Sequence, residues 1–369
     1  MGTKFTNWLE INLSAVEANT REVIRRTHTP LMAVVKANAY GMGAVEIARV
    51  VVAAGAEYLA VARSCEAMAL RQAGIQTPIL LFGVPAEGEI DALINAEVTL
   101  TLTGYEALEF YTRRASALQK RLKVHLKVDT GMGRFGVMAE EVLELGLKAN
   151  ANSWLELEGI YMHFPNIDSY PDDPLNSIQI KRFEQALTSL KNNGIQLKWM
   201  HAANSGAALA FPETLFNMTR VGSALVGIRP FYYAPLPEYL RRVLTWKVGL
   251  TSCRVMPEGW GISYGQTYHT RKDEIIGVIP AGYADGFRRA ANNEVLIDGQ
   301  RVPVVGKVCA DMAMLRLPKM VPLGTEVVLL GTQGSESIQI EDLADRWNTA
   351  QADVVAVINS RVERIYIRN

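Results

Sequence analysis

The sequence is poor in cysteine, balanced in charge and free of long apolar runs. Its 369 residues contain three cysteines, Cys65, Cys253 and Cys309, too few and too scattered for a disulfide framework or a zinc site. This usage predicts a reducing compartment, the cytoplasm. Lysine plus arginine and aspartate plus glutamate number 38 each, so the charge does not favour nucleic acid or an anionic membrane as a partner. No apolar run approaches membrane-spanning length. The composition therefore predicts an ordinary globular protein.

Two common kinds of site are also missing from the sequence. No group of carboxylates has the spacing of metal ligands, which argues against a metal enzyme and predicts no metal site. There is no Walker phosphate loop. Gly41 and Gly43 begin a G-x-G pattern, but Glu46 occupies the place of the third glycine, so the dinucleotide fingerprint fails.

The amino-terminal part of the chain alternates short apolar runs with helical patterns. Short apolar runs bounded by turn residues are typical of strands buried on both faces. Their alternation with segments of helical periodicity, such as 44–55 and 183–194, favours an α/β fold, a (β/α)8 TIM-like barrel. An open doubly wound sheet is the alternative, and the number of runs favours closure. The expected strands are at 31–36, 58–62, 78–83, 98–103, 122–129, 157–164, 197–202 and 217–222.

The pattern changes near residue 240. Several segments joined by Gly, Pro, Asn and Asp turns are typical of strands, and only 340–358 has a helical pattern. The sequence therefore predicts a barrel domain at 1–240 and a predominantly β domain at 241–369. Residues 1–13 are a candidate extra strand for the second domain.

One charged residue stands at an unexpected place, because Lys36 directly follows the apolar run 31–35. Lysine is almost never buried without a partner or a purpose. A lysine at a strand tip can keep its amine in water, which is the simple interpretation. The chemical interpretation is a lysine held in a pocket to form a Schiff base.

Other polar residues follow the expected barrel strands, where TIM-like barrels carry their function. A site built from cations, small polar groups and backbone N–H groups suits an anionic ligand, and HAANSG (201–206) and RVGSA (220–224) fall where barrels bind phosphate. A lysine nucleophile beside a phosphate site points to pyridoxal phosphate. The strand-end residues are Lys36, Arg134, His163, Asn204, Ser205 and Arg220.

At this point the chain resembles a known family, the alanine racemases, which are pyridoxal-phosphate-dependent amino-acid racemases of fold type III. The resemblance covers essentially the whole chain. It implies a barrel that binds the cofactor, a β-rich second domain and a head-to-tail homodimer with shared active sites. It also implies interconversion of L- and D-alanine by two bases, which supplies D-alanine for peptidoglycan. The matching motifs are AVVKANAYGMG, KVDTGMGRFG, HAANSG, RVGSALVG, GISYGQTY and AGYADGFRR.

The resemblance also implies roles for single residues. Lys36 would hold pyridoxal phosphate and act as one base, and Tyr264 of the partner subunit would be the other. Arg134 would bind the substrate carboxylate, with Asp311 beside that site. Lys127 would be carbamylated and steady Arg134, although its alternation with apolar residues also suits an ordinary strand lysine. The remaining cofactor-binding residues would be Tyr40, His163, His201, Asn204, Ser205, Arg220, Gly222 and Ser223, and the entrance would be lined by Tyr283 and Arg289.

Two departures from the family pattern bear on the substrate. Ala310 stands where the family usually has methionine, and Ser360 where it usually has tyrosine, both expected beside the substrate. Each change removes bulk, so a racemase for serine or for a broader set of amino acids is the alternative function. A fold-type III decarboxylase is disfavoured, because such enzymes place a carboxylate where Arg220 is expected. A pyridoxal-phosphate homeostasis protein is disfavoured because it would be a barrel alone.

Overall fold

The structure is a computed structural model that describes residues 6–368. Residues 1–5 and 369, which the predicted domain ranges include, lie outside the described residues. The chain divides into two compact units. One contains residues 15–39 and 44–241, and the other contains residues 6–14, 40–43 and 242–368.

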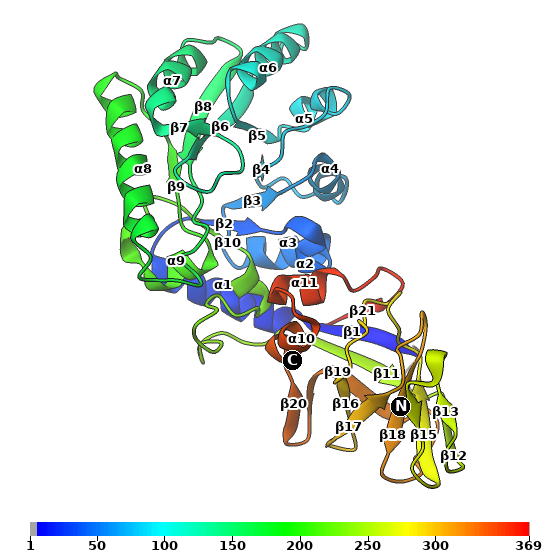
Figure 1. The fold of residues 1–369 in the computed structure, drawn as a ribbon. Helices are drawn as coiled ribbons and strands as arrows, with labels where there is room; N and C mark the ends of the chain where they lie inside the picture. The colour runs from blue at the N-terminus through cyan, green and yellow to red at the C-terminus, as the bar shows by residue number, and fades with distance from the viewer. Residues whose placement is uncertain (1–5, 369) are drawn as a thin grey trace. The chain divides into compact units, whose positions relative to one another are not determined.

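The first unit is a nearly closed barrel of parallel strands with helices on the outside (Figure 1). Within residues 6–368 the sheet runs in the order β10-β2-β3-β4-β5-β6-β8-β9, and a short strand, β7 (Val137–Met138), pairs with β6. Each predicted run overlaps one of these strands, and the predicted fold class is confirmed. The barrel strands are β2 (Leu31–Val34), β3 (Tyr58–Val61), β4 (Ile79–Leu81), β5 (Thr99–Leu102), β6 (Leu122–Asp129), β8 (Leu155–Tyr161), β9 (Trp199–His201) and β10 (Thr219–Val221).

The barrel helices follow their strands, as right-handed β–α–β crossovers require. Buried apolar residues recur along them at helical spacing, for example Ile47, Val50 and Val51 in α3. The helices of this unit are α1 (Leu13–Thr27), which begins in the other unit, α3 (Ala44–Ala53), α4 (Ser64–Gln72), α5 (Ile90–Asn95), α6 (Tyr105–Ala117), α7 (Val142–Asn150), α8 (Pro174–Asn192) and α9 (Ser205–Ala210).

The first and last barrel strands meet. Strand β10 pairs in parallel with β2, with Arg220 opposite Met32. On its other side the Arg220 N–H donates to Ala203 O at 3.1 Å, just beyond the end of β9. This contact brings the chain after β9 against β10 and sets the buried side chain of Arg220 among the strand ends.

Alternate residues along two barrel strands are polar and buried. Thr99 and Thr101 alternate on β5, and His125 and Lys127 alternate on β6. Residues two apart in a strand share one face of the sheet. Polar side chains from neighbouring strands therefore gather on one buried face, where each needs a hydrogen-bond partner.

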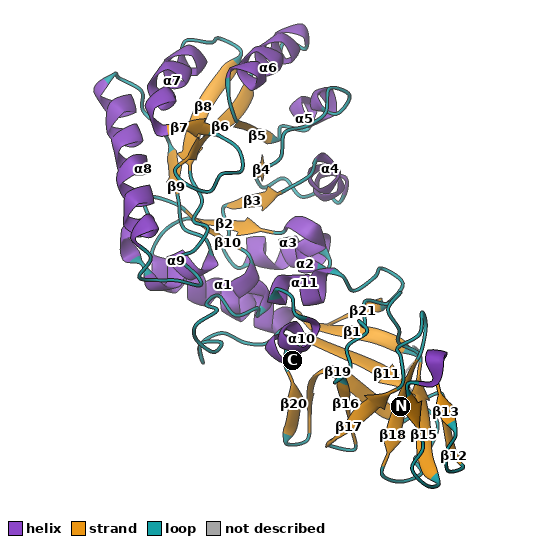
Figure 2. Cartoon of the chain, viewed as in Figure 1, coloured by secondary structure: helices purple, strands orange, loops and turns teal. Residues whose placement is uncertain are grey.

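The second unit is built mainly of strands (Figure 2). Its main sheet has the order β12-β15-β18-β17-β16-β19-β11-β1-β21, with β20 paired to β19, and β13 pairs with β14 separately. Its strands are β1 (Asn7–Asn12), β11 (Leu244–Gly249), β12 (Ser252–Met256), β13 (Gly261–Ile262), β14 (Tyr268–His269), β15 (Glu274–Ile279), β16 (Glu294–Ile297), β17 (Gln300–Val305), β18 (Ala313–Leu317), β19 (Glu326–Gln333), β20 (Glu336–Ile338) and β21 (Glu363–Ile367).

The amino-terminal strand lies inside this sheet and not at its edge. β1 pairs antiparallel with β11 and parallel with β21, so Leu9 lies between Trp246 and Arg364. The hairpin β16–β17 turns at Asp298 and Gly299, whose φ values are 49° and 72°. Two positive φ angles at an Asp-Gly pair are typical of a type I′ turn, which suits the twist of the two strands.

The predicted helix at 340–358 forms as two helices, α10 (Ile340–Trp347) and α11 (Gln351–Ala356). Asn348 has φ 50° and ends α10 in the left-handed conformation that asparagine tolerates. The helical spacing of apolar residues does not reveal this break, because the spacing continues across both helices. No helix in the part of the chain that the structure describes is long and apolar enough to cross a membrane.

Candidate active site

Lys36 lies two residues beyond the end of β2, at the start of a left-handed turn. Ala37, Asn38 and Ala39 have φ values of 52°, 55° and 51°, and Tyr40 continues at 56°. The Ala39 N–H donates to Val35 O at 2.9 Å, and Asn38 Oδ1 accepts from the Ala44 N–H at 2.8 Å. The next residue, Gly41, has no room for a Cβ, which would meet Val355 O at 2.5 Å. The turn thus bends the chain sharply straight after Lys36.

Left-handed conformation costs an ordinary L-residue roughly 1–2 kcal/mol, and this cost persists only where the surroundings enforce it. We predict that Ala37→Gly raises the free energy of unfolding by about 0.5–1 kcal/mol, because glycine adopts positive φ without that cost. The matched control is Ala69→Gly, at an exposed alanine inside the right-handed helix α4. It should lower the free energy of unfolding by about 0.5–1 kcal/mol. Denaturant titration measures both, and two changes of the same sign would mean that the turn is not strained.

The Lys36 amine lies among groups that favour its neutral form. Burial lowers the pKa of Lys36, the positive charge of Arg134 lowers it further, and Glu66 opposes both. Glu66 is fixed in place, because its Oε2 accepts from the Ala62 and Arg63 N–H groups at 2.9 and 3.0 Å. The nucleophilic form of lysine is the neutral amine, so the shift makes Lys36 more reactive near neutral pH.

Arg134 belongs to a loop that Asp129 organises at the end of β6. Asp129 Oδ1 accepts from the Gly131, Met132 and Gly133 N–H groups at 2.9, 2.9 and 3.2 Å. Arg134 is exposed, and its guanidinium lies 5.2 Å from the centre of the Phe135 ring. Within residues 6–368 it has no hydrogen-bond partner, so its five donors can take an anionic ligand.

Lys127 is one of the largest fully buried side chains described, with 1% exposure. Its Nζ donates to Val128 O at 2.5 Å and lies 5.7 Å from the centre of the Tyr161 ring. Burial is the largest cause that lowers the pKa of Lys127, to about 7, and Arg220 and Arg134 lower it further. Gly136 lets β7 pass close by, since a Cβ there would meet Lys127 Cγ at 2.9 Å.

Arg220 is buried and holds two histidines. Its Nη1 lies 2.9 Å from His201 Nδ1, and its Nη2 lies 3.4 Å from His163 Nδ1. Burial is the first cause that lowers the pKa of His163 well below its usual value, followed by the charges of Arg220, Arg134, Lys36 and Lys127. Three of the cations predicted at strand ends, Lys36, Arg134 and Arg220, thus act on the pKa of His163, together with Lys127 of β6.

The loop after β9 and the loop after β10 meet at Ser205. Ser205 Oγ accepts from the Gly222 N–H at 3.2 Å and from the Ala224 N–H at 3.5 Å. Ser223 begins the short helix η3 (Ser223–Val226), for which Gly222 is the N-cap residue. Asn204 has a structural role, because its Oδ1 caps α9 by accepting from the Ala207 N–H at 2.9 Å.

The predicted residues of the second unit are mostly exposed. Tyr264 has 68% of its surface exposed, and Tyr283 has 50%. Burial raises the pKa of Tyr40, which belongs to this unit. Ser360 is exposed, while Ala310 is half-buried with its backbone against Gly282.

Asp311 has a partner that sequence reasoning missed. Arg361 donates through Nη2 to Asp311 Oδ1 at 2.7 Å and through Nε to Asp285 Oδ1 at 2.6 Å. Arg361 directly follows Ser360, and its contacts tie that turn to the loop of Asp311. Asp285 lies within the quoted motif AGYADGFRR but was given no role, and no quoted motif contains Arg361.

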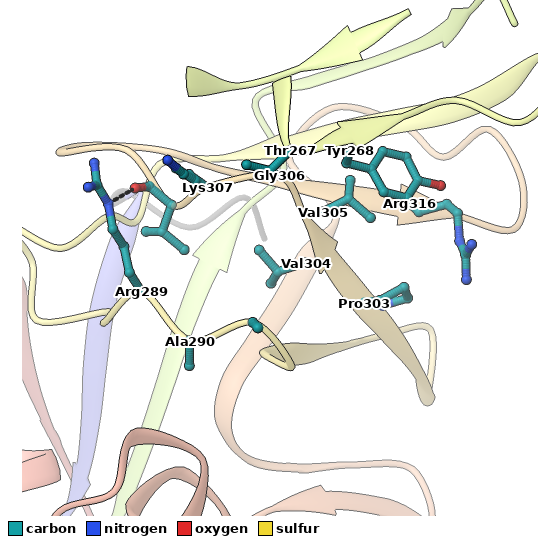
Figure 3. A pocket seen from close by; sticks show the side chains of 12 residues that line it. Thr267, Tyr268, Arg289, Ala290, Pro303, Val304, Val305, Gly306, Lys307 and Arg316 are labelled. Atoms are coloured by element: carbon teal, nitrogen blue, oxygen red, sulfur yellow. Dashed lines mark hydrogen bonds between the residues drawn. The ribbon is translucent and has the colours of Figure 1, made fainter. Parts of the chain in front are cut away.

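A cavity of about 600 Å³ lies next to Arg289 in the second unit (Figure 3). Its cationic lining residues are Arg289, Lys307 and Arg316, and its apolar side includes Val304 and Val305. Arg289 Nε donates to Val308 O at 2.7 Å, the bond drawn in the figure. The predicted entrance residue Arg289 thus borders an open, positively charged space.

The chain is similar to known proteins along its whole length. Residues 11–230 match the sequence model described as alanine racemase, N-terminal domain, and residues 243–366 match that of the alanine racemase C-terminal domain. An alanine racemase of Methanococcus maripaludis is 41% identical over 98% of this chain and 98% of its own. One from Geobacillus stearothermophilus is 40% identical over 98% of this chain and 94% of its own. The crystal structure of alanine racemase from Bacillus anthracis with bound L-Ala-P superimposes with a TM-score of 0.94 at 36% identity, covering 100% of this chain and 97% of that one.

Proposed function

The chain belongs to the alanine racemase family, an isomerase family, and from this premise we propose that it interconverts L-alanine and D-alanine with pyridoxal phosphate as its cofactor. The observation that carries the proposal is the environment of Lys36. An amine with a lowered pKa begins a strained turn after a barrel strand. The charge of Arg134 lowers the pKa of this amine, and the charge of the amine in turn lowers the pKa of His163. In a bacterial cytoplasm the product would supply D-alanine for peptidoglycan.

The residues present fit pyridoxal phosphate. Lys36 offers an amine for its aldehyde, and Arg220 offers a buried donor for its ring nitrogen. Ser205, whose Oγ accepts from the Gly222 and Ala224 N–H groups, offers its own O–H as a donor for the phosphate, together with the hydroxyls of Tyr40 and Ser223. When bound, the cofactor makes the α-proton of an amino acid removable by delocalising the electron pair left behind.

Racemisation requires one proton acceptor on each face of the α-carbon, because one face loses a proton and the other gains it. Lys36 would serve one face with its neutral amine, which the lowered pKa favours. Tyr264 of the partner subunit would serve the other face. Arg134 would hold the substrate carboxylate between the two bases by paired N–H donors.

The exposure of Tyr264 supports its assignment to a homodimer. A side chain with 68% of its surface exposed is available to a second molecule, and Trp260 on the same segment is 55% exposed. Large exposed aromatic side chains are typical of surfaces that bind another protein. Each active site of the proposed dimer would then combine one barrel with the second unit of the partner.

A chiral product assay over a panel of L-amino acids tests the function. We expect L-alanine to give D-alanine, with turnover that depends on added pyridoxal phosphate after its removal. The small side chains at Ala310 and Ser360 favour one alternative, measurable racemisation of serine. A pocket distinguishes two substrates that differ by one methylene by only about 1–3 kcal/mol, so the loss of bulk at these two positions can admit serine beside alanine. Equal or faster turnover of L-serine would support the broader function, and absence of any D-amino acid would refute both.

We predict that Lys127 carries a carbamate. Carbon dioxide reacts with a neutral amine, and with a pKa of about 7 the Lys127 amine is largely neutral above neutral pH. Protein prepared in ¹³C-bicarbonate should show a carbamate carbon signal that weakens as the pH falls below about 7. Lys127→Met should abolish that signal and lower kcat/KM roughly tenfold or more, because Arg134 loses a neighbouring anion.

The control for this experiment lies on the same strand. Although burial lowers it, Glu158 raises the pKa of Lys123, which therefore remains protonated and unreactive. Lys123→Met should leave the carbamate signal in place. A signal that survives in Lys127→Met would assign the carbamate to another amine.

A further inference from the structure

The Arg220 guanidinium is a buried cation whose direct partners are neutral. Its Nη1 donates to His201 O at 2.8 Å, and its Nη2 donates to Met162 O and Ala202 O at 2.7 and 2.9 Å. The other two partners are the imidazoles of His201 and His163. Burial lowers the pKa of Arg220 only to about 10, so the group stays charged. A buried charge is costly unless an opposite charge accompanies it.

The contacts of Arg220 fix the proton positions on two histidines. Arginine only donates hydrogen bonds, so His201 Nδ1 must accept, and the single ring proton of His201 is on Nε2. That Nε2 lies 2.8 Å from His125 Nδ1, which must therefore accept as well. The proton of His125 is then on Nε2, 3.3 Å from Glu158 Oε2. Each bond points from the arginine toward the carboxylate.

Both imidazoles are held neutral and in place. Burial first, and then the charge of Arg220, lowers the pKa of His201 well below its usual value. Burial also lowers the pKa of His125, although Glu158 opposes that shift. A second proton on either ring would set an N–H against another N–H or against the guanidinium. The Tyr161 ring stacks on His201 at 5.0 Å with an interplanar angle of 4°, which keeps the imidazole from turning over.

The row of hydrogen bonds ends at a buried carboxylate. Glu158 is 4% exposed, and besides His125 it accepts from Tyr58 Oη at 3.0 Å and from Lys123 Nζ at 3.1 Å. A second cation, Lys198 Nζ, lies 3.8 Å from Glu158 Oε1. Although burial raises it, these hydrogen bonds lower the pKa of Glu158 to about 2, so the carboxylate is charged. Hydrogen bonds that all point the same way polarise one another. The anion thus acts on the cation across two neutral rings.

We propose that Glu158 is the counterion of Arg220 through His125 and His201, and that Glu158 and His125 are positioning residues that hold the guanidinium as a fixed donor. That Arg220 faces the ring of the cofactor rests on the proposed function. The row of hydrogen bonds from Arg220 to Glu158 does not depend on that function. Neither His125 nor Glu158 was among the residues that the family resemblance marked.

The first test reads the histidine protons directly. The holoenzyme is labelled with ¹⁵N in its five histidines, and NMR signals are assigned with variants that lack one histidine each. We expect His125 and His201 to carry one proton, on Nε2, throughout pH 6 to 9. A doubly protonated ring, or a proton on Nδ1 of either residue, would overturn the proposal. This result is independent of any turnover, so it stands or falls separately from the racemase activity.

The second test uses Glu158→Gln, which keeps an acceptor oxygen and removes the charge. The matched control is Glu156→Gln, at a less buried carboxylate on the same strand. We expect the guanidinium protons of Arg220, identified by their loss in Arg220→Lys, to exchange with solvent at least tenfold faster in Glu158→Gln and unchanged in the control. The denaturation midpoint should fall in Glu158→Gln, and the fall should be at least halved when the same substitution is made together with Arg220→Met. Unchanged exchange, or a fall that is the same in both backgrounds, would mean that Glu158 is not the counterion.

Discussion

Replacing Lys36 by alanine should lower kcat for racemisation by roughly 10³-fold or more, since the variant loses both the amine proposed to hold the cofactor and one of the two proposed bases. The reason lies in the placement of this residue. The strained turn 36–40 follows the end of β2, and burial and the charge of Arg134 lower the pKa of the Lys36 amine there. The assay is chiral chromatography of alanine at saturating pyridoxal phosphate.

A covalent readout separates the loss of chemistry from the loss of folding. Borohydride should fix labelled cofactor to the peptide that contains Lys36 in the native protein and leave Lys36→Ala unlabelled. The control is Lys120→Ala, at an exposed lysine beyond α6, which should keep labelling and activity. Label recovered on a different lysine of the native chain would refute the assignment.

Mixing two inactive chains should restore activity if the sites are shared between subunits. Lys36→Ala lacks one proposed base and Tyr264→Phe lacks the other, so each homodimer should be nearly inactive. A mixed dimer contains one site with both bases intact, because the intact barrel receives Tyr264 of the partner subunit. With free exchange of equal amounts, about a quarter of the native activity should return, since half the dimers are mixed and each has one working site.

The matching control carries both substitutions in one chain. Mixed with either single variant it offers no intact site, and activity should stay at the level of the inactive homodimers. No recovery in the main experiment, with exchange demonstrated by differently tagged chains, would place Tyr264 and Lys36 in separate sites or in the same subunit.

The barrel could be predicted from sequence because its strands differ clearly from its helices. Runs such as Leu31–Val34 are apolar throughout, as a strand buried on both faces requires, and α3 shows apolar residues at helical spacing. The break at Asn348 was missed for a physical reason. Asparagine is also tolerated within helices, and only its left-handed φ, which depends on local packing, ends α10 there.

The site was only partly accessible to sequence reasoning. Lys36 stands out because a charge follows an apolar run, whereas His125 and Lys127 alternate with apolar residues on β6. Alternation shows that the two share a face but not that the face is buried. Glu158 could not be recognised either, because its contact with His125 joins residues 33 apart in the sequence, on two different strands. Period-two polar residues on a predicted barrel strand are the signal that could have drawn attention to them.

The position of β1 has a consequence for the order in which the chain can fold. Residues 7–12 are synthesised long before their partners, which are residues 244–249 and 363–367. Contacts of such sequence separation slow folding, because a long loop must close before they form. The β sheet of the second unit therefore cannot be completed until residues 363–367 have been synthesised, and until then one edge of β1 has no partner strand. An unpaired strand edge can pair with another molecule and start aggregation. We therefore expect folding of this chain to depend on chaperones or on low concentration at a late stage, after most of the barrel residues have been synthesised.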